Sequence, residues 1–335
     1  MQAKAKSATA GLLIGIVLAA MLLLAGCDQK TAIDDDPSPS ANTLTGVSLS
    51  PRSFESADFT DFFHKANETG DVVSWAGDWN ELAKTTDSAP KIVAELASTY
   101  DYVPMIELQF FTQSSGQLLR PLDATNKLSY KNSTVAFAGN HQPRYLGLGI
   151  EVNILYDKSP TDFDAFVSFY ADVYDAVKAV SPDTEVFTVF QLERMKGLSG
   201  GLFGGVNDPN KAQWSLLDRF SKSDIIAFST YPNLVYKNPE EIPDDYYSEI
   251  RAHTSKRIAF TEIGWHSSDS PSGWESSETE QAQFITKFTT LTAMMDMEMA
   301  IWSFMYDQST FEPFNSMGLR RSDGSPRPAW DEWVG

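Results

Sequence analysis

The feature that most constrains the fold is a regular alternation of short apolar runs with longer amphipathic segments. Eight apolar runs are rich in Val, Ile, Phe and Trp, as strands buried on both faces of a sheet are. They cover residues 45–50, 71–77, 102–110, 144–155, 185–193, 224–232, 257–265 and 298–306. Strands that alternate with helices form parallel sheets, and eight such units predict a single (β/α)8 barrel of the TIM type.

The segments between these runs have helical periodicity of varying clarity. In residues 162–180 apolar side chains recur every three or four positions and stop before Pro182, so a helix is predicted there. Residues 277–295 have the same pattern. Residues 111–142 are polar and poorly periodic, and they are predicted to form an extended loop above the barrel as part of a binding cleft.

An open, doubly wound sheet is the alternative architecture. It would place a Gly-rich phosphate-binding loop after the first strand. Residues 46–59, which read GVSLSPRSFESADF, contain no such loop. The barrel is therefore the favoured interpretation.

The N-terminus reads as a secretory signal. Lys4 and Lys6 precede an apolar run over residues 11–24, and small residues follow it up to Cys27, the single cysteine of the chain. The alternative, a transmembrane anchor, would need a longer apolar run. LLAGC resembles the bacterial lipobox, which implies lipidation of Cys27 and a lipid-anchored location in the cell envelope, with the leaflet left open.

The predicted domains follow from this boundary. Residues 1–27 are a lipoprotein signal peptide, residues 28–44 are a flexible linker rich in Asp, Pro and Ser, and residues 45–335 are the catalytic barrel. We expect a monomer held at the membrane through the lipid on Cys27.

Charge and motif content exclude several function classes. The chain has 26 Lys and Arg against 45 Asp and Glu, and this acidic balance argues against nucleic acid as a partner. The four histidines show no metal-binding spacing, and no Gly-x-Ser-x-Gly motif of a serine hydrolase is present. No metal and no cofactor is predicted.

Two carboxylates close apolar strands of the predicted barrel. Glu151 lies towards the end of the fourth run and Glu262 towards the end of the seventh. Reactive groups of such barrels gather at the C-terminal ends of the strands, so these two side chains should face each other across the mouth. Glycoside hydrolysis needs such a pair, one carboxyl to protonate the leaving oxygen and one to attack the anomeric carbon or activate water.

Other polar and aromatic residues near strand ends are candidates for binding a carbohydrate. Aromatic rings can stack on sugar faces, and polar groups can bind hydroxyls. The predicted substrate-binding residues are Tyr231, Trp302, Trp265, Asn153, His266, Arg52, Trp75 and Glu107.

Several segments together resemble the clan A glycoside hydrolases, which are retaining (β/α)8 enzymes. FTEIGW (260–265) is similar to the nucleophile segment of families 53 and 17, FSTYPNL (228–234) to their sixth strand, and GLGIEVN (147–153) to their fourth. The tail, residues 318–333, resembles the closing loop and last helix of many clan members.

The resemblance implies a role for each matching residue. Glu151 would be the general acid/base and Glu262 the nucleophile of a double displacement. Tyr231 would donate a hydrogen bond to Glu262, and Trp302 would form the platform under the sugar. Apart from the resemblance, the long segment 111–142 and the many aromatic residues suggest an open cleft for a β-linked polysaccharide or oligosaccharide.

One position departs from the clan pattern. The residue before the acid/base is usually Asn, which binds the sugar 2-hydroxyl, and here it is Ile150. Asn153 lies two residues after Glu151, so the two would share a face if the strand continued. Ile150 leaves a second hypothesis open, a catalytically inactive, lipid-anchored glycan-binding protein on the same barrel.

Overall fold

The computed structural model describes residues 43–86 and 88–335. The predicted signal peptide (1–27), its Cys27 and residues 28–42 of the predicted linker lie outside the described residues. Leu44, predicted as the last linker residue, is instead the first residue of strand β1 (Leu44–Ser48).

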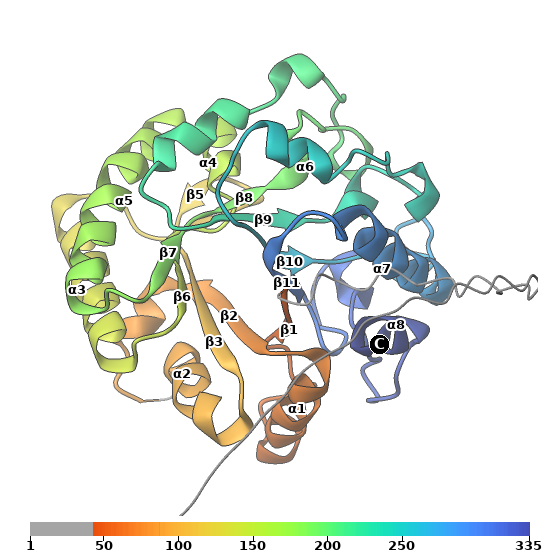
Figure 1. Ribbon diagram of the computed structural model, residues 1–335, viewed down its shortest axis with the longest axis horizontal. Helices are drawn as coiled ribbons and strands as arrows, with labels where there is room; N and C mark the ends of the chain where they lie inside the picture. The colour runs from red at the N-terminus through yellow and green to blue at the C-terminus, as the bar shows by residue number, and fades with distance from the viewer. Residues whose placement is uncertain (1–42, 87) are drawn as a thin grey trace, which may run out of the picture. The chain divides into compact units, whose positions relative to one another are not determined.

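A barrel of parallel strands forms the centre of the fold (Figure 1). The other strands that build it are β2 (Val72–Asp78), β3 (Val103–Gln109), β6 (Tyr145–Gly147), β7 (Glu185–Phe187), β8 (Val189–Gln191), β9 (Ile226–Thr230), β10 (Ile258–Ile263) and β11 (Met297–Trp302). They pair in the order β7-β6-β3-β2-β1-β11-β10-β9-β8. Strands β7 and β8 are two halves of one predicted strand, interrupted at Thr188. The predicted eight-stranded barrel is therefore confirmed.

Helices surround the barrel in Figure 1. They are α1 (Ser56–Thr69), α2 (Ala89–Tyr100), α3 (Ala124–His141), α4 (Val152–Lys158), α5 (Pro160–Val180), α6 (Leu192–Met195), α7 (Glu278–Thr292) and α8 (Pro328–Val334). Short 3₁₀ helices lie in the connections: η1 (Trp79–Ala83), η2 (Gly201–Phe203), η3 (Pro209–Lys211), η4 (Trp214–Phe220), η5 (Pro232–Leu234), η6 (Pro239–Glu241), η7 (Ser248–Ala252) and η8 (Phe314–Ser316). The predictions for 162–180 and 277–295 are confirmed within a few residues at each end.

The prediction for residues 111–142 was wrong. A small hairpin, β4 (Phe111–Thr112) with β5 (Gln117–Leu118), is followed by the long helix α3. Its buried side chains include Tyr130, Thr134 and Phe137 at helical spacing. Thr134 donates to the Tyr130 carbonyl at 2.8 Å, which lets a polar residue lie on the buried face. Polar residues on both faces concealed the helical period.

The barrel interior changes character along its axis. At the N-terminal side the inward-facing residues form an apolar plug of Leu44, Val72, Val103, Met105, Tyr145, Phe187, Val189, Ile225, Ala227, Ala259, Met299 and Ile301. Five polar residues each come two positions after a plug residue, and so share its face. This polar layer consists of Ser74, Glu107, Ser229, Thr261 and Ser303, and it forms the floor of the site described next.

Candidate active site

Glu151 lies just beyond β6, where the chain turns into α4. The structure shows that the predicted fourth strand ends early, at Gly147, and that Glu151 has a left-handed backbone with φ 53°. Non-glycine residues rarely adopt this conformation, and the strain concentrates at functional sites. It turns the Glu151 side chain toward β9, where the Ser229 hydroxyl donates to its carboxyl at 2.6 Å.

Glu262 reaches the same compartment through an irregularity in β10. The pairing register with β9 shifts between Phe260 and Glu262, so Thr261 and Glu262 do not simply alternate across the sheet. Tyr231, directly after β9, donates its hydroxyl to Glu262 Oε2 at 2.8 Å. The predicted bond between Tyr231 and Glu262 is therefore present in the structure.

Burial raises the pKa of both carboxyls, but the charge and the hydrogen bonds around them differ. Burial and then the charge of Glu262 raise the pKa of Glu151 to about 8, against a smaller lowering by Ser229. Burial raises the pKa of Glu262, while the Tyr231 hydroxyl lowers it. Glu262 therefore ionises first, and Glu151 keeps its proton through neutral pH. Two carboxyls driven apart in this way suit a nucleophile and a general acid.

Glu193 is a third buried carboxyl, and our sequence analysis did not include it among the site residues. Its side chain has no exposed surface and accepts hydrogen bonds from Gln191, from the Thr230 hydroxyl (2.9 Å), from the Tyr231 backbone N–H (3.1 Å) and from the Tyr246 hydroxyl (2.8 Å). These bonds fix the Tyr231 backbone, and with it the donor to Glu262. The end of the fifth predicted strand was the signal that could have identified Glu193.

Glu107, a predicted substrate-binding residue, occupies the polar layer. Its side chain is 1 % exposed, and neither carboxyl oxygen has a hydrogen-bond partner. Burial and then the charges of Glu262 and Glu151 raise its pKa well above the usual range. Glu107 is therefore a neutral acid beneath the pair, too deeply buried to contact substrate in this conformation.

Both tryptophans predicted as sugar platforms point away from the mouth. Trp302 and Trp265 have no exposed surface. The Trp302 indole N–H donates to the Met317 carbonyl at 2.8 Å, and the Trp265 ring stacks on Phe284 of α7 at 5.0 Å between centroids. Both rings thus belong to the layer between barrel and helices, and the prediction that they stack on sugar was wrong. The sequence indicates that a residue lies near the end of a strand, but not which face of the strand it occupies.

Asn153 also differs from its prediction. It lies in the first turn of α4, fully buried, and its amide exchanges hydrogen bonds with the backbone of Gln191 at 2.8 and 3.0 Å. The shared strand face with Glu151 does not exist, because the chain has already turned into a helix. Asn153 instead ties α4 to β8.

The remaining three candidates lie apart from the glutamate pair. Trp75 is 8 % exposed and packs over Gly77, where a Cβ would come within 2.6 Å of its ring. His266 is buried between Asn233 (3.1 Å) and the Trp274 carbonyl (2.8 Å). Arg52 pairs with Asp58 at 2.6 Å on the loop after β1. The structure gives these three no contact with either catalytic candidate.

A separate apolar cluster adjoins Glu262. Its buried members are Tyr231, Leu234 and Met317, and the half-buried rings of Phe203, Phe304 and Phe314 pack against them. A Cβ at Gly264 would come within 2.8 Å of Tyr231 and 2.9 Å of Met317, so glycine permits this close approach. Unlike Trp265 and Trp302, the three phenylalanines keep accessible surface.

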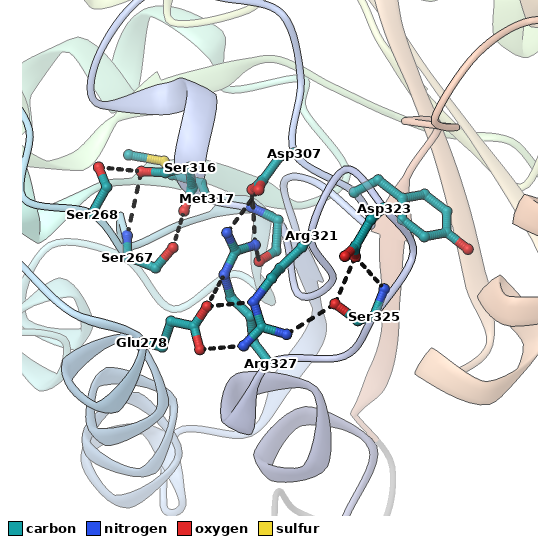
Figure 2. A network of polar contacts seen from close by, with 12 residues as sticks. Ser267, Ser268, Glu278, Asp307, Ser316, Met317, Arg321, Asp323, Ser325 and Arg327 are labelled. Carbon is teal, nitrogen blue, oxygen red and sulfur yellow. Dashed lines mark hydrogen bonds and ion pairs between the residues drawn. The ribbon is translucent and has the colours of Figure 1, made fainter.

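The loop from β11 to α8 (residues 303–327), which supplies three of these cluster residues, is fixed by the ion pairs in Figure 2. Arg327, 7 % exposed, donates two bonds to Asp307 at 2.7 and 2.8 Å. Arg321 donates to Glu278 at the start of α7 at 2.7 and 2.5 Å. Both pairs are bidentate, and the more buried of the two, Arg327 with Asp307, holds its geometry more firmly than the partly exposed Arg321 with Glu278. The loop is therefore held in place before any ligand binds.

Solved structures with this fold include glycoside hydrolases. A family 39 glycoside hydrolase from the gut symbiont Bacteroides cellulosilyticus WH2 has a TM-score of 0.62 and 17% identity over 90% of this chain and 64% of its own. An exo-β-1,4-mannosidase from Opitutaceae bacterium strain TAV5 has a TM-score of 0.61 and 13% identity over 91% of this chain and 61% of its own. Xylanase 10B from Thermotoga maritima has a TM-score of 0.59 and 11% identity over 87% of this chain and 94% of its own.

At these identities the likeness shows the fold. The chain spans less than two thirds of the length of the first two structures. No protein-family model and no curated protein matches the chain.

Within residues 43–86 and 88–335, no group of three His, Cys, Asp or Glu side chains is arranged to hold a metal ion. Over the same residues, no helix has both the length and the apolar content that crossing a membrane requires.

Proposed function

We propose that this protein is a retaining glycoside hydrolase that cleaves a β-linked polysaccharide or oligosaccharide with Glu262 as nucleophile and Glu151 as general acid/base. The observation that carries the proposal is the environment of the pair. Tyr231 and Ser229 each supply one hydrogen bond, and burial together with the charge of Glu262 raises the pKa of Glu151, so that it keeps its proton. Glycosidase names among structures of the same fold support it.

The reaction has two steps that balance. The Glu262 carboxylate attacks the anomeric carbon while Glu151 gives its proton to the departing glycosidic oxygen, leaving a glycosyl ester on Glu262. Glu151, now ionised, then takes a proton from water, which attacks the same carbon and releases Glu262. Two displacements at one carbon retain its configuration.

The experiment is an assay of reducing ends released from β-glucans, galactans, mannans and xylans by a form beginning at Asp28. Glu262→Gln and Glu151→Gln are assayed beside the parent. We expect the parent to release sugar from one class of glycan and both variants to lose that activity. Turnover that survives in both variants would contradict the proposal.

The second candidate is a glycan-binding protein without turnover, and Ile150 favours it. Ile150 is 5 % exposed and apolar, so the 2-hydroxyl contact that the clan makes from this position is missing. A parent that binds a glycan of the panel but releases no reducing ends would establish this alternative.

A lipid anchor on Cys27 and a monomeric state at the cell envelope remain proposals as well. Metabolic labelling with a fatty acid, lost in Cys27→Ser, would test the anchor.

A further inference from the structure

A row of three aromatic rings leads from Glu262 to solvent. Tyr231 bonds Glu262 at 2.8 Å, and its ring meets Phe314 edge to face at 5.1 Å between centroids. Phe314 in turn meets Phe311 at 5.2 Å. Exposure rises along the row, from 4 % at Tyr231 through the half-buried Phe314 to 70 % at Phe311.

The row has the chemistry that a neutral sugar chain requires. Aromatic faces contact the C–H faces of sugars, and phenylalanine adds no charge or hydrogen-bonding group that would select one hydroxyl pattern. A single isolated phenylalanine on the surface would need no explanation. Phe311 is not isolated, because it packs on Phe314 and so extends an aromatic cluster that contacts the candidate catalytic carboxyl of Glu262.

The backbone that carries Phe311 and Phe314 is held at several points. The Ser267 backbone N–H and hydroxyl donate to the Ser316 carbonyl at 3.1 and 2.7 Å, and Arg327 donates to the Gly318 carbonyl at 2.9 Å (Figure 2). At Gly318 a Cβ would come within 2.4 Å of the Asp307 nitrogen. A surface ordered before binding loses less entropy when a ligand arrives.

We propose that the row Tyr231–Phe314–Phe311 is an extended binding surface for a neutral oligosaccharide, which runs from the cleaved bond outward along the loop between β11 and α8. The sugar units beyond the reaction centre stack first on Phe314 and then on Phe311. This proposal rests on the proposed function, because the order of sugar units along the row is counted outward from Glu262, where the bond would be cleaved.

The test uses the full chain and a series of neutral β-linked oligosaccharides, from disaccharide to hexasaccharide, of the class that the reducing-end assay identifies. For the parent, kcat/KM should rise with chain length until the row is filled. Phe311→Ala should reduce kcat/KM for the longer members by about three- to tenfold, mainly through KM, and leave the disaccharide unchanged. Met294→Ala, 96 % exposed in the connection from α7 to β11, is the matched control and should change nothing.

Phe314 is half-buried, so its removal can also disturb packing. Phe314→Leu keeps most of the volume but no ring, and its melting temperature is measured in parallel. Loss of the length dependence in a variant that melts normally supports the row. A length dependence that survives in folded Phe311→Ala and Phe314→Leu would overturn it, while leaving the glycosidase intact.

A binding measurement separates failure of this inference from failure of the proposed function. Mobility in gels that contain each glycan of the panel is compared for the parent and Phe311→Ala. A parent that hydrolyses nothing but is retarded by one glycan, with weaker retardation of Phe311→Ala, would refute the glycosidase and support the row. Neither hydrolysis nor retardation by any glycan would overturn both.

Discussion

The apolar plug and the polar layer are built by the same strands, two residues apart, yet they serve different ends. In the plug, Phe187 and Met299 belong to an apolar cluster and have no exposed surface. In the layer above, Ser229 and Ser303 donate to Glu151 and to the Ile263 carbonyl at 2.6 and 2.9 Å. Two residues along each strand separate a region that stabilises the barrel from a region that lies beneath the two proposed catalytic carboxyls.

The layer also contains an acid whose polar atoms lack partners. Glu193, beside it, accepts four hydrogen bonds, whereas Glu107 accepts none. An unpaired buried carboxyl costs stability. The plug carries no such cost, so substitutions in the two regions should separate stability from activity.

The largest effect should come from Glu262→Gln. Removing the proposed nucleophile should lower kcat by roughly three orders of magnitude or more, since residues that act together in bond-making fail as a unit. Stability should be unchanged or higher, because one buried charge is gone. Steady-state kinetics measures the fall in kcat, and thermal melting measures the stability. A variant that melts far below the parent would contradict the prediction that the polar layer serves activity at the expense of stability.

Phe187→Ala tests the plug and should have the reverse effect to Glu262→Gln, lowering stability while leaving activity almost unchanged. Truncating a fully buried phenylalanine should lower the free energy of unfolding by about 3–5 kcal/mol, measured by denaturant titration. The folded fraction should retain kcat within about twofold. A large fall in kcat per folded molecule would show that plug and layer are not separable.

Tyr231→Phe removes only the hydroxyl that donates to Glu262. A hydrogen bond to a charged group contributes about 1.5–3 kcal/mol, so kcat/KM should fall about ten- to hundredfold. Without this donor the pKa of Glu262 rises, so the acid limb of the pH profile should move to higher pH. An acid limb that stays in place would mean that Tyr231 does not control the ionisation of Glu262.

Glu107→Leu should raise the free energy of unfolding by about 1–3 kcal/mol, because it removes unpaired buried oxygens. Glu107→Gln, which keeps a polar group there, is the matched comparison and should gain less. Since Glu107 is neutral at rest, the alkaline limb of the pH profile should stay in place in Glu107→Gln. A shift of both limbs to lower pH would show that Glu107 is ionised in the parent.

The last prediction concerns the dependence of the free energy of unfolding on pH. The pKa of Glu151 rises from 4.5 unfolded to about 8 folded, so the folded protein holds a proton that the unfolded chain has lost between these values. Its contribution is complete below pH 4.5 and is lost as pH rises to about 8, by about 1.4 kcal/mol per pH unit. Activity should likewise fall above about pH 8. Denaturant titrations across this range check the slope, and rising stability would contradict the assignment.

Much of the fold was predictable because apolar period and strand ends are local properties. The sequence identifies Glu151 and Glu262 near the ends of two apolar runs. In the structure Glu151 accepts a hydrogen bond from Ser229 of β9, and Glu262 accepts one from Tyr231 directly after β9. The sequence predicts which residue ends a strand, but the side-chain direction there depends on bulges and turns. Trp302 faces α7 instead of the mouth for this reason.

Helix α3 and the aromatic row show two other limits of prediction from the sequence. Thr134 is buried in α3 because its hydroxyl bonds back to the preceding turn, which residue type alone does not predict. Phe311 and Phe314 lie in a loop whose position depends on pairs such as Arg327 with Asp307, twenty residues apart. Contacts between residues this far apart in the sequence form only in the folded chain, so local sequence patterns do not predict them.

The most direct test of the central claim is to trap the sugar on the enzyme. The parent is incubated with an activated 2-deoxy-2-fluoro glycoside of the sugar that it hydrolyses, which slows release of the glycosyl ester, and the labelled peptide is sequenced by mass spectrometry. The account predicts one sugar per chain on Glu262, with the label still formed in Glu151→Gln because the leaving group needs no proton. A label on another residue, or none from a substrate that the parent turns over, would contradict it.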